Sequence, residues 1–398
     1  MGHFDDECVD IEVLKRRAFN YRWAEVPEGV IPLTAADPDF SAAPCIRDAM
    51  LDYVRDGNFS YTPKLGYESF REAIAEGLLN RKDERIDPKL VLPIDSAARG
   101  MYTVAKAFLK PGDEMIVFDP CDFLFRESCL AAGGVPVMYP ARLVDGRIDL
   151  SDLEEFVTDR TRMIGLCNPH NPYGATYSRE DLEHIMDVCE RHDLRIINDE
   201  IWSDIVYPDA TFTSVYALGN ERCRRVSSVF GFSKSFGLAG LRIGCVYTTD
   251  EADFDALVEA SDVMSTAGGI ASISQVAGEA AMREGYGWVD EFVAHLTRNR
   301  DYAVDRINAM PLLRAYRPHA TYLLYVDISK TNMTGAEFCD WLKEEERLAL
   351  IPGGAKFFGE QSEGHIRICF ATSKGILEEG LGRLGRGVQK LATGSGCC

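Results

Sequence analysis

The sequence predicts an α/β fold built around a mostly parallel β-sheet. The middle of the chain alternates short apolar runs, typical of buried strands, with stretches whose apolar residues recur at helical spacing. The runs at 163–167 and 194–198 flank one such stretch, which makes a β-α-β unit with two parallel strands. A chain of 398 residues is long enough for two domains. We place a large α/β domain at 46–275 and a smaller α+β domain at 1–45 plus 276–398.

Local signals predict the individual elements in chain order. Ser96 is placed to cap a helix that ends at Pro111-Gly112. Ser178, followed three residues later by Asp181, is placed to begin the helix of the β-α-β unit. The other elements expected from apolar patterning are strands at 115–118, 226–230 and 320–326 and a helix at 286–310.

The composition disfavours several functional classes. The 63 acidic and 43 basic residues give a net charge of -20, which argues against nucleic acid and anionic membrane as partners. The 12 cysteines include no Cys-x-x-Cys pair and no cysteine–histidine cluster at metal-ligand spacing, so we expect no metal site and reduced thiols in the cytoplasm. No signal peptide or membrane-spanning run is expected, and the end at 394–398 is expected to be frayed.

Polar clusters follow three of the predicted strands, at Asn168–Gly174, Asp199-Glu200 and Ser233-Lys234. Ligands of open parallel sheets bind at the carboxyl ends of the strands, so these clusters are site candidates. Lys234 lies between Phe232 and Phe236, where desolvation would lower the pKa of its ammonium group and free the amine as a nucleophile. An exposed loop lysine is the structural alternative.

Two further charged residues fit the same picture. Asp199 follows a predicted strand and could partner a cationic ring nitrogen, although a helix-capping or surface carboxylate has the same local pattern. Arg242 lies in a glycine-rich turn eight residues beyond Lys234, and its forked guanidinium suits a phosphate or carboxylate.

In this order and spacing, Asn171-Pro172, Asp199, Ser233-Lys234 and Arg242 resemble the fold-type I pyridoxal 5′-phosphate (PLP) enzymes of the class I/II aminotransferase superfamily. The similarity runs from Ile31 to about Leu384. It implies PLP as the cofactor and a seven-stranded type of sheet in the large domain. It also implies a homodimer that shares its active site between subunits and acts on a small amino acid and a 2-oxo acid.

The resemblance implies a role for each candidate residue. Lys234 would form the Schiff base with the cofactor and move the substrate's Cα proton, while Asp199 would keep the pyridine nitrogen protonated. Arg367 would pair with the substrate α-carboxylate, beside Asn171 and the backbone near Ala36. The other implied cofactor contacts are Asn171 at the phenolic oxygen, Ser233, Arg242 and the amides of Ser96 and Ala97 at the phosphate, Tyr61 of the neighbouring subunit at the phosphate, and Phe123 and Trp202 at the ring.

Some positions depart from the family pattern. Asp122 stands where an aromatic side chain usually stacks on the ring, so Phe123 or Phe125 is expected to take that place. Trp202 stands three residues after Asp199, where many relatives have tyrosine. Residues 262–275, where dicarboxylate-specific relatives tend to carry a second arginine, contain none, which disfavours aspartate and glutamate as dedicated donors.

The branch within the superfamily stays open at this point. The run Arg283–Asp290 is similar to the MalY/PatB branch, which includes cystathionine β-lyase-type C–S lyases and some regulatory proteins. Thr34, Trp202 and the run Gly364–Cys369 differ from the lyase pattern. We therefore predict an aminotransferase, with a C–S lyase and a regulatory protein that retains the fold as the alternatives.

Overall fold

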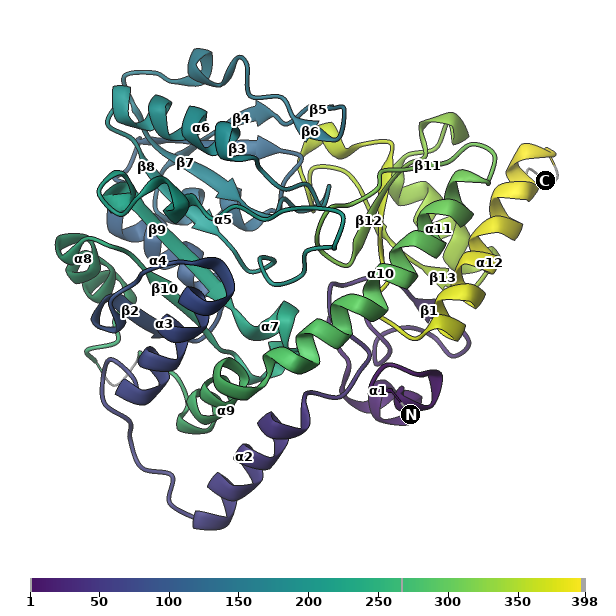
Figure 1. Ribbon diagram of the computed structural model, residues 1–398. Coiled ribbons are helices and arrows are strands. Elements are labelled where there is room, and N and C mark those ends of the chain that lie inside the picture. Colours follow the sequence, from purple (N-terminus) through teal and green to yellow (C-terminus); the bar gives the residue numbers. More distant parts are fainter. Residues whose placement is uncertain (1, 266–267, 395–398) are drawn as a thin grey trace.

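The computed structural model describes residues 2–265 and 268–394, and its larger part contains a seven-stranded sheet (Figure 1). The strand order is β2 (Val91–Ile94), β10 (Gly244–Tyr247), β9 (Val226–Gly231), β8 (Arg195–Asp199), β7 (Thr161–Cys167), β3 (Glu114–Asp119) and β4 (Val135–Pro140). Only β10 runs antiparallel to its neighbours in this sheet. The predicted fold class is therefore confirmed.

The β-α-β unit forms as predicted. Strands β7 and β8 pair in parallel, with Leu166 opposite Asn198. The helix between them, α6 (Arg179–Arg191), begins with a capping box in which Ser178 and Asp181 satisfy each other's backbone N–H groups. These two interactions fix where the helix begins. Because β7 and β8 are parallel and Cys167 lies opposite Asp199, both strands end at the same edge of the sheet.

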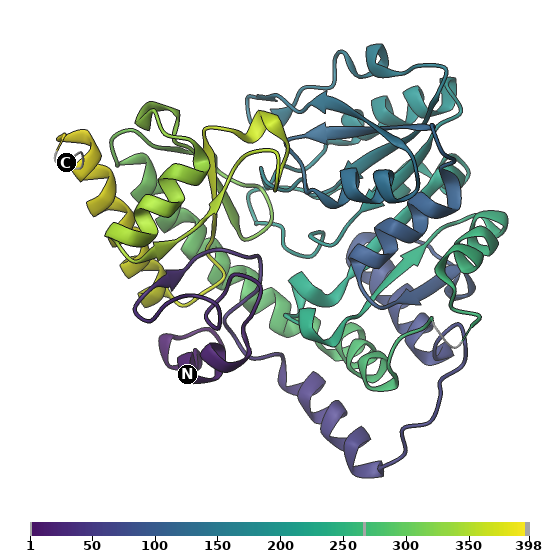
Figure 2. The same ribbon diagram turned by 180° about the vertical axis from the view of Figure 1, so that it is seen from behind.

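Helices lie on both faces of this sheet. Helix α4 (Ala97–Phe108) begins at Ser96, whose side chain accepts the N–H of Arg99, and it lies behind the sheet in Figure 1 and before it in Figure 2. The other helices in this part of the chain are α2 (Pro44–Asp56), α3 (Glu68–Lys82), α5 (Leu124–Ala131), α7 (Phe232–Ser235), α8 (Glu251–Ser261) and α9 (Ser272–Glu284).

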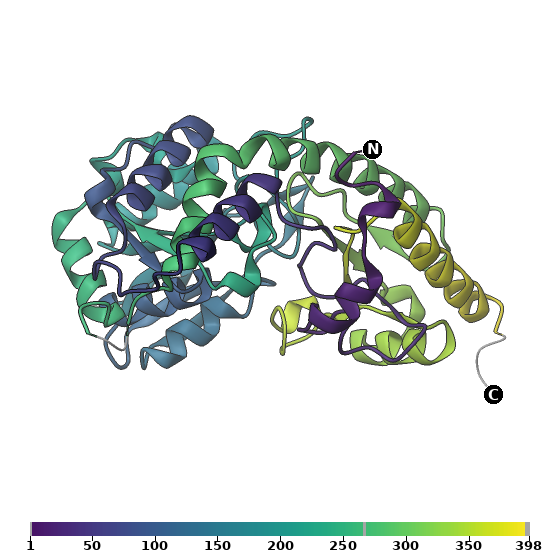
Figure 3. The same ribbon diagram turned by 90° about the horizontal axis from the view of Figure 1, so that it is seen from below.

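A second, smaller body forms from the two ends of the chain. It holds the antiparallel sheet β11 (Arg314–Ala315), β12 (Leu323–Asp327), β15 (His365–Cys369) and β14 (Ile351–Pro352), with helices α11 (Gly335–Glu345) and α12 (Lys374–Ala392). The N-terminal segment with α1 (Ile11–Arg17) joins it, because β1 (Ile31–Pro32) pairs with β13 (Leu348–Ala349). Figure 3 shows helix α10 (Tyr286–Asn308) running from one body to the other. The domain boundaries at 46 and 275 stay a prediction.

Several expectations concern groups that are absent. Within the described part of the chain, no helix is long and apolar enough to span a bilayer. In those same residues, histidine, cysteine, aspartate and glutamate side chains form no group of three or more that could hold a metal ion. The ten cysteines between Cys8 and Cys369 are free thiols. The expected frayed tail, with Cys397 and Cys398, lies outside the described residues, apart from Gly394.

Candidate active site

A cavity of about 480 Å³ opens at the carboxyl ends of β7, β8 and β9, where it meets the smaller body. Most of the candidate site residues predicted from distant parts of the sequence line this cavity. The predicted residues that line it are Ala36, Ser96, Ala97, Phe123, Asn171, Asp199, Trp202, Ser233, Lys234, Arg242 and Arg367. Tyr61 is 94% exposed and lines a different cavity.

Lys234 supplies an amine in the interior of this cavity. The short helix α7 follows β9 directly, and from it the Lys234 Nζ donates a hydrogen bond of 2.7 Å to the carbonyl of Ala36. The amine also lies 5.6 Å from the centre of the Trp202 ring. Burial lowers the pKa of Lys234, although the nearby Asp37 carboxylate opposes the change. A lysine with a lowered pKa is a better nucleophile at neutral pH.

Asp199 places a carboxylate at the end of β8. Its Oδ1 accepts the N–H of Ile201 at 3.0 Å. Burial raises the pKa of Asp199 to about 7, and the nearby Asp122 carboxylate adds to the rise. Among the described residues, no lysine, arginine or histidine forms an ion pair with Asp199. A buried carboxylate without an ion-pair partner favours the binding of a cation beside it.

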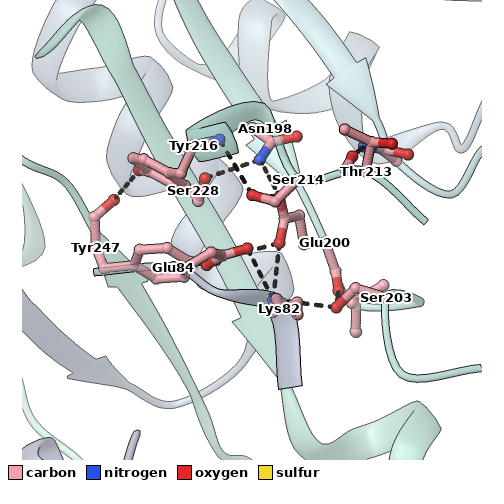
Figure 4. Close-up of polar contacts among 12 residues, drawn as sticks. Lys82, Glu84, Asn198, Glu200, Ser203, Thr213, Ser214, Tyr216, Ser228 and Tyr247 are labelled. Atoms are coloured by element: carbon pink, nitrogen blue, oxygen red, sulfur yellow. Dashed lines mark hydrogen bonds and ion pairs between the residues drawn. The ribbon is translucent and has the colours of Figure 1, made fainter. Parts of the chain in front are cut away.

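A buried network of charged and polar side chains lies around Glu200, next to the end of β8 (Figure 4). Because side chains alternate along a strand, Glu200 points away from the cavity, and Lys82 Nζ lies 2.7 Å from its Oε2. Lys82 also lies 3.4 Å from Glu84, while Asn198 donates to Glu200 at 2.8 Å. Burial and the neighbouring Glu200 raise the pKa of Glu84 to about 8. These contacts fix the backbone from which Asp199 projects.

The N-terminus of α4 forms an anion-binding corner of the cavity. Arg242 Nη2 donates to Ser96 Oγ at 2.9 Å, which brings its guanidinium to the first turn of the helix. Gly244 lies against this turn, where a Cβ would come within 2.8 Å of the Ala97 nitrogen. The lack of a side chain at this position therefore lets β10 approach the helix start. Backbone N–H groups and a guanidinium together favour a phosphate group.

Arg367 provides a second anion-binding group across the cavity. It projects from β15, is buried, and has no hydrogen-bond partner for its Nε among the described residues. Its Nη1 donates weakly, at 3.4 Å, to Asn171 Oδ1, and its guanidinium lies 4.9 Å from the Phe358 ring centre. Burial lowers the pKa of Arg367. A buried guanidinium with an unused donor is a ready partner for a carboxylate.

Of the two phenylalanines expected to stack on the cofactor ring, only one lines the cavity. Phe125 is fully buried and packs over Gly165 in the core, so it cannot stack on a group in the cavity. Phe123 is 42% exposed and lines the cavity, so it stays the predicted stacking residue. Trp202 is buried with its ring edge against Tyr322, at 4.7 Å between ring centres.

Apart from Arg367, sequence reasoning missed the side chains that the smaller body contributes. Tyr21, Phe357 and Phe358 line the cavity together with Ile351. Tyr21 has a left-handed backbone, with φ at 62°, and its carbonyl accepts a hydrogen bond from the buried Thr34 hydroxyl. None of them belongs to a motif, and no local signal marks the left-handed turn. Tertiary packing of the smaller body brings them to the site.

The cavity fits PLP group by group. Lys234 can bind the aldehyde, Asp199 lacks the cation that a pyridine nitrogen would supply, and Arg242 with the α4 N-terminus can hold the phosphate. Such a cavity in a seven-stranded, mostly parallel sheet defines a PLP-dependent enzyme of fold type I. Residues 28–384 match the family model for aminotransferase class I and II. The chain belongs to this family.

Known proteins from two activities are similar to the chain. An aspartate aminotransferase of Pyrococcus horikoshii is 31% identical, with 91% of each chain covered. A cystathionine beta-lyase of Corynebacterium glutamicum is 30% identical, over 94% of this chain and 98% of the lyase. Among solved structures, an aromatic aminotransferase from Pyrococcus horikoshii has a TM-score of 0.85 at 31% identity, with 93% of this chain and 98% of that chain covered.

Proposed function

We propose that the protein is an aminotransferase that moves the amino group of an L-amino acid to a 2-oxo acid. The observation that carries this proposal is the pairing, in one cavity, of the Lys234 amine with the buried Arg367 guanidinium. The Lys234 amine can move a proton while the Arg367 guanidinium holds a carboxylate. Both partners of a transamination, the amino acid and the 2-oxo acid, carry a carboxylate next to the reacting carbon.

Each residue would do one part of the work. Bound PLP supplies an electron sink for the pair released when the Cα proton leaves. Arg367 would bind the α-carboxylate and, with Asn171, orient the Cα–H bond. Lys234 would take the proton from Cα, because its lowered pKa leaves a larger share of the amine unprotonated. Asp199 would hold a proton on the ring nitrogen by remaining a carboxylate beside it.

The proposed active unit is a homodimer. Phe59, Tyr61 and Met264 are apolar side chains that are 62%, 94% and 50% exposed and line one cavity of about 780 Å³ on the surface. Clustered exposed apolar groups of this kind are typical of protein interfaces. We propose that Tyr61 crosses this interface to the phosphate site of the second subunit. The free buried cysteines support a reducing compartment, and we propose the cytoplasm.

A C–S β-lyase is the second candidate, favoured by the similarity to the Corynebacterium lyase. Both reactions begin with removal of the Cα proton. They diverge afterwards, because a lyase must also expel a thiolate from Cβ. Thr34 and Trp202 both differ from the lyase pattern. Thr34 donates a hydrogen bond to the carbonyl of Tyr21, and the Trp202 ring lies beside the Lys234 amine.

One assay separates the two reactions. The holoenzyme is incubated with cystathionine, S-methylcysteine and a panel of ordinary amino acids, first without any 2-oxo acid. An aminotransferase stops after one equivalent of 2-oxo acid product and resumes when 2-oxoglutarate or pyruvate is added. Continuous release of thiol and pyruvate without an acceptor, faster than any transamination, would replace the aminotransferase proposal with the lyase.

A further inference from the structure

The charged groups of the cavity leave one carboxylate without an assigned task. Arg242 serves the phosphate corner, Asp199 the ring nitrogen, Lys234 the aldehyde and Arg367 the substrate carboxylate. Of the aspartate, lysine and arginine side chains in the cavity lining, Lys356 and Asp122 then remain. Lys356 is exposed, with its ammonium over the Phe357 ring at 5.1 Å, so water screens its charge.

Asp122 lies next to the place where the substrate would bind. Its Oδ2 accepts from Asn171 Nδ2 at 2.9 Å, and the other end of the same Asn171 amide accepts from Arg367 at 3.4 Å. One amide side chain therefore separates Asp122 from the proposed carboxylate anchor. Its Oδ1 accepts the N–H of Leu124 at 3.1 Å, which holds the carboxylate at the start of α5. Among the described residues no cation lies within ion-pair distance of Asp122, although its charge opposes the lowering of the pKa of Arg367 and of Lys234 by burial.

Aromatic rings line the same cavity as this carboxylate. Tyr21, Phe357 and Phe358 line the same cavity, and we call them the aromatic wall. The rings of Tyr21 and Phe357 meet edge to face at 6.4 Å, and Thr34 holds the Tyr21 backbone in place. Aromatic faces attract planar and cationic groups, and an unpaired carboxylate attracts N–H donors and repels anions.

We infer that Asp122, with the aromatic wall, selects amino acids whose side chain is planar and carries an N–H donor, such as imidazole, indole or guanidinium, over dicarboxylic amino acids. The inference rests on the proposed function, because it takes Arg367 as the α-carboxylate anchor. A substrate held there directs its side chain into the space next to Asp122. A distal carboxylate would meet a like charge at that place, whereas an N–H group would gain a hydrogen bond.

The test measures binding separately from turnover. The holoenzyme is titrated by calorimetry with four carboxylates that lack an α-amino group and cannot react: imidazolepropionate, indolepropionate, phenylpropionate and succinate. We expect the two N–H ligands to bind at least about tenfold more tightly than phenylpropionate, which has the ring without the donor, and succinate to bind most weakly. Asp122→Asn should remove at least about tenfold of the preference for the N–H ligands over succinate.

A matched control separates the charge of Asp122 from its capping role. Asp250 also accepts a backbone N–H at a helix start, that of Asp253 at 3.1 Å, and does not line the cavity. Asp250→Asn should leave the order of the four ligands unchanged. Succinate binding as tightly as indolepropionate, no binding of any ligand, or an unchanged order in Asp122→Asn would each overturn the inference. If the predicted order appears but no amino acid is turned over, the aminotransferase proposal fails and the pocket inference stands.

Discussion

Replacing Asp199 by asparagine should stabilise the cofactor-free protein while it impairs the enzyme. Burial raises the pKa of Asp199 from its usual 3.8 to about 7. One pKa unit corresponds to about 1.36 kcal/mol, so keeping this carboxylate ionised at pH 8 costs the folded apoprotein up to about 4 kcal/mol. Asparagine cannot ionise, and its amide oxygen can still accept the N–H of Ile201.

The direction of the pH dependence follows from the raised pKa. A protonated Asp199 favours the folded state fully below about pH 4, and this advantage is lost as the pH rises to about 7. Wild-type apoprotein should therefore lose stability over that range relative to Asp199→Asn. The gap between the two should be largest at pH 8 and close near pH 4.

Urea unfolding of both apoproteins at pH 4, 6 and 8 measures the free energy of unfolding. In the holoenzyme the same substitution should lower turnover by at least ~100-fold, the scale of removing one preorganised electrostatic partner. An apoprotein variant that is less stable than wild type by the same amount at every pH would refute the reasoning, because the carboxylate would then not be desolvated.

Three further predictions concern other parts of the molecule. Borohydride reduction of the holoenzyme should attach the cofactor to Lys234, as located by peptide mass spectrometry, and attachment to another lysine would contradict the site. Mixing inactive Lys234→Ala with inactive Tyr61→Ala subunits should restore part of the activity through hybrid dimers, whereas a fully active monomer would exclude the shared site. Lys82→Met leaves Glu200 buried without its cation and should cost about 3–5 kcal/mol of unfolding free energy in urea, while Lys15→Met, in an exposed pair, should cost less than about 1 kcal/mol. Equal losses in these two variants would mean that the network in Figure 4 is not a desolvated ion pair.

The parallel core was predictable because its signals are local. The Ser178 capping box and the apolar runs on either side of α6 specify a β-α-β unit without reference to the rest of the chain. The strand-end rule then placed Asp199 and Lys234 at one edge before any contact was known. Strand β10 was not among the predicted strands, and its antiparallel direction could not be predicted either, because a buried apolar run has the same pattern in either direction.

The residues that line the substrate side of the cavity could not be predicted from local sequence signals. Glu200 follows Asp199 in the sequence and shares its charge, yet strand alternation turns it into the network around Lys82. Tyr21 has a left-handed backbone, held by a hydrogen bond from Thr34 to its carbonyl and by one from its own N–H to Glu25. Such positions depend on contacts between residues far apart in the chain, and a single sequence does not display them.

Two departures from the family pattern, Asp122 and Trp202, line the cavity itself. Lys234, Asp199 and Arg242, which we propose serve the cofactor, all agree with the pattern. Asp122 differs from the family pattern and Thr34 from the lyase pattern, and the structure places one beside Asn171 and the other under Tyr21, where they shape the space next to Arg367. Because Lys234, Asp199 and Arg242 match the family, we expect the shared first step, proton removal from Cα, to be kept. A changed wall alters which side chain fits and what becomes of it after that step, so the identity of the substrate must be sought at Asp122 and Tyr21.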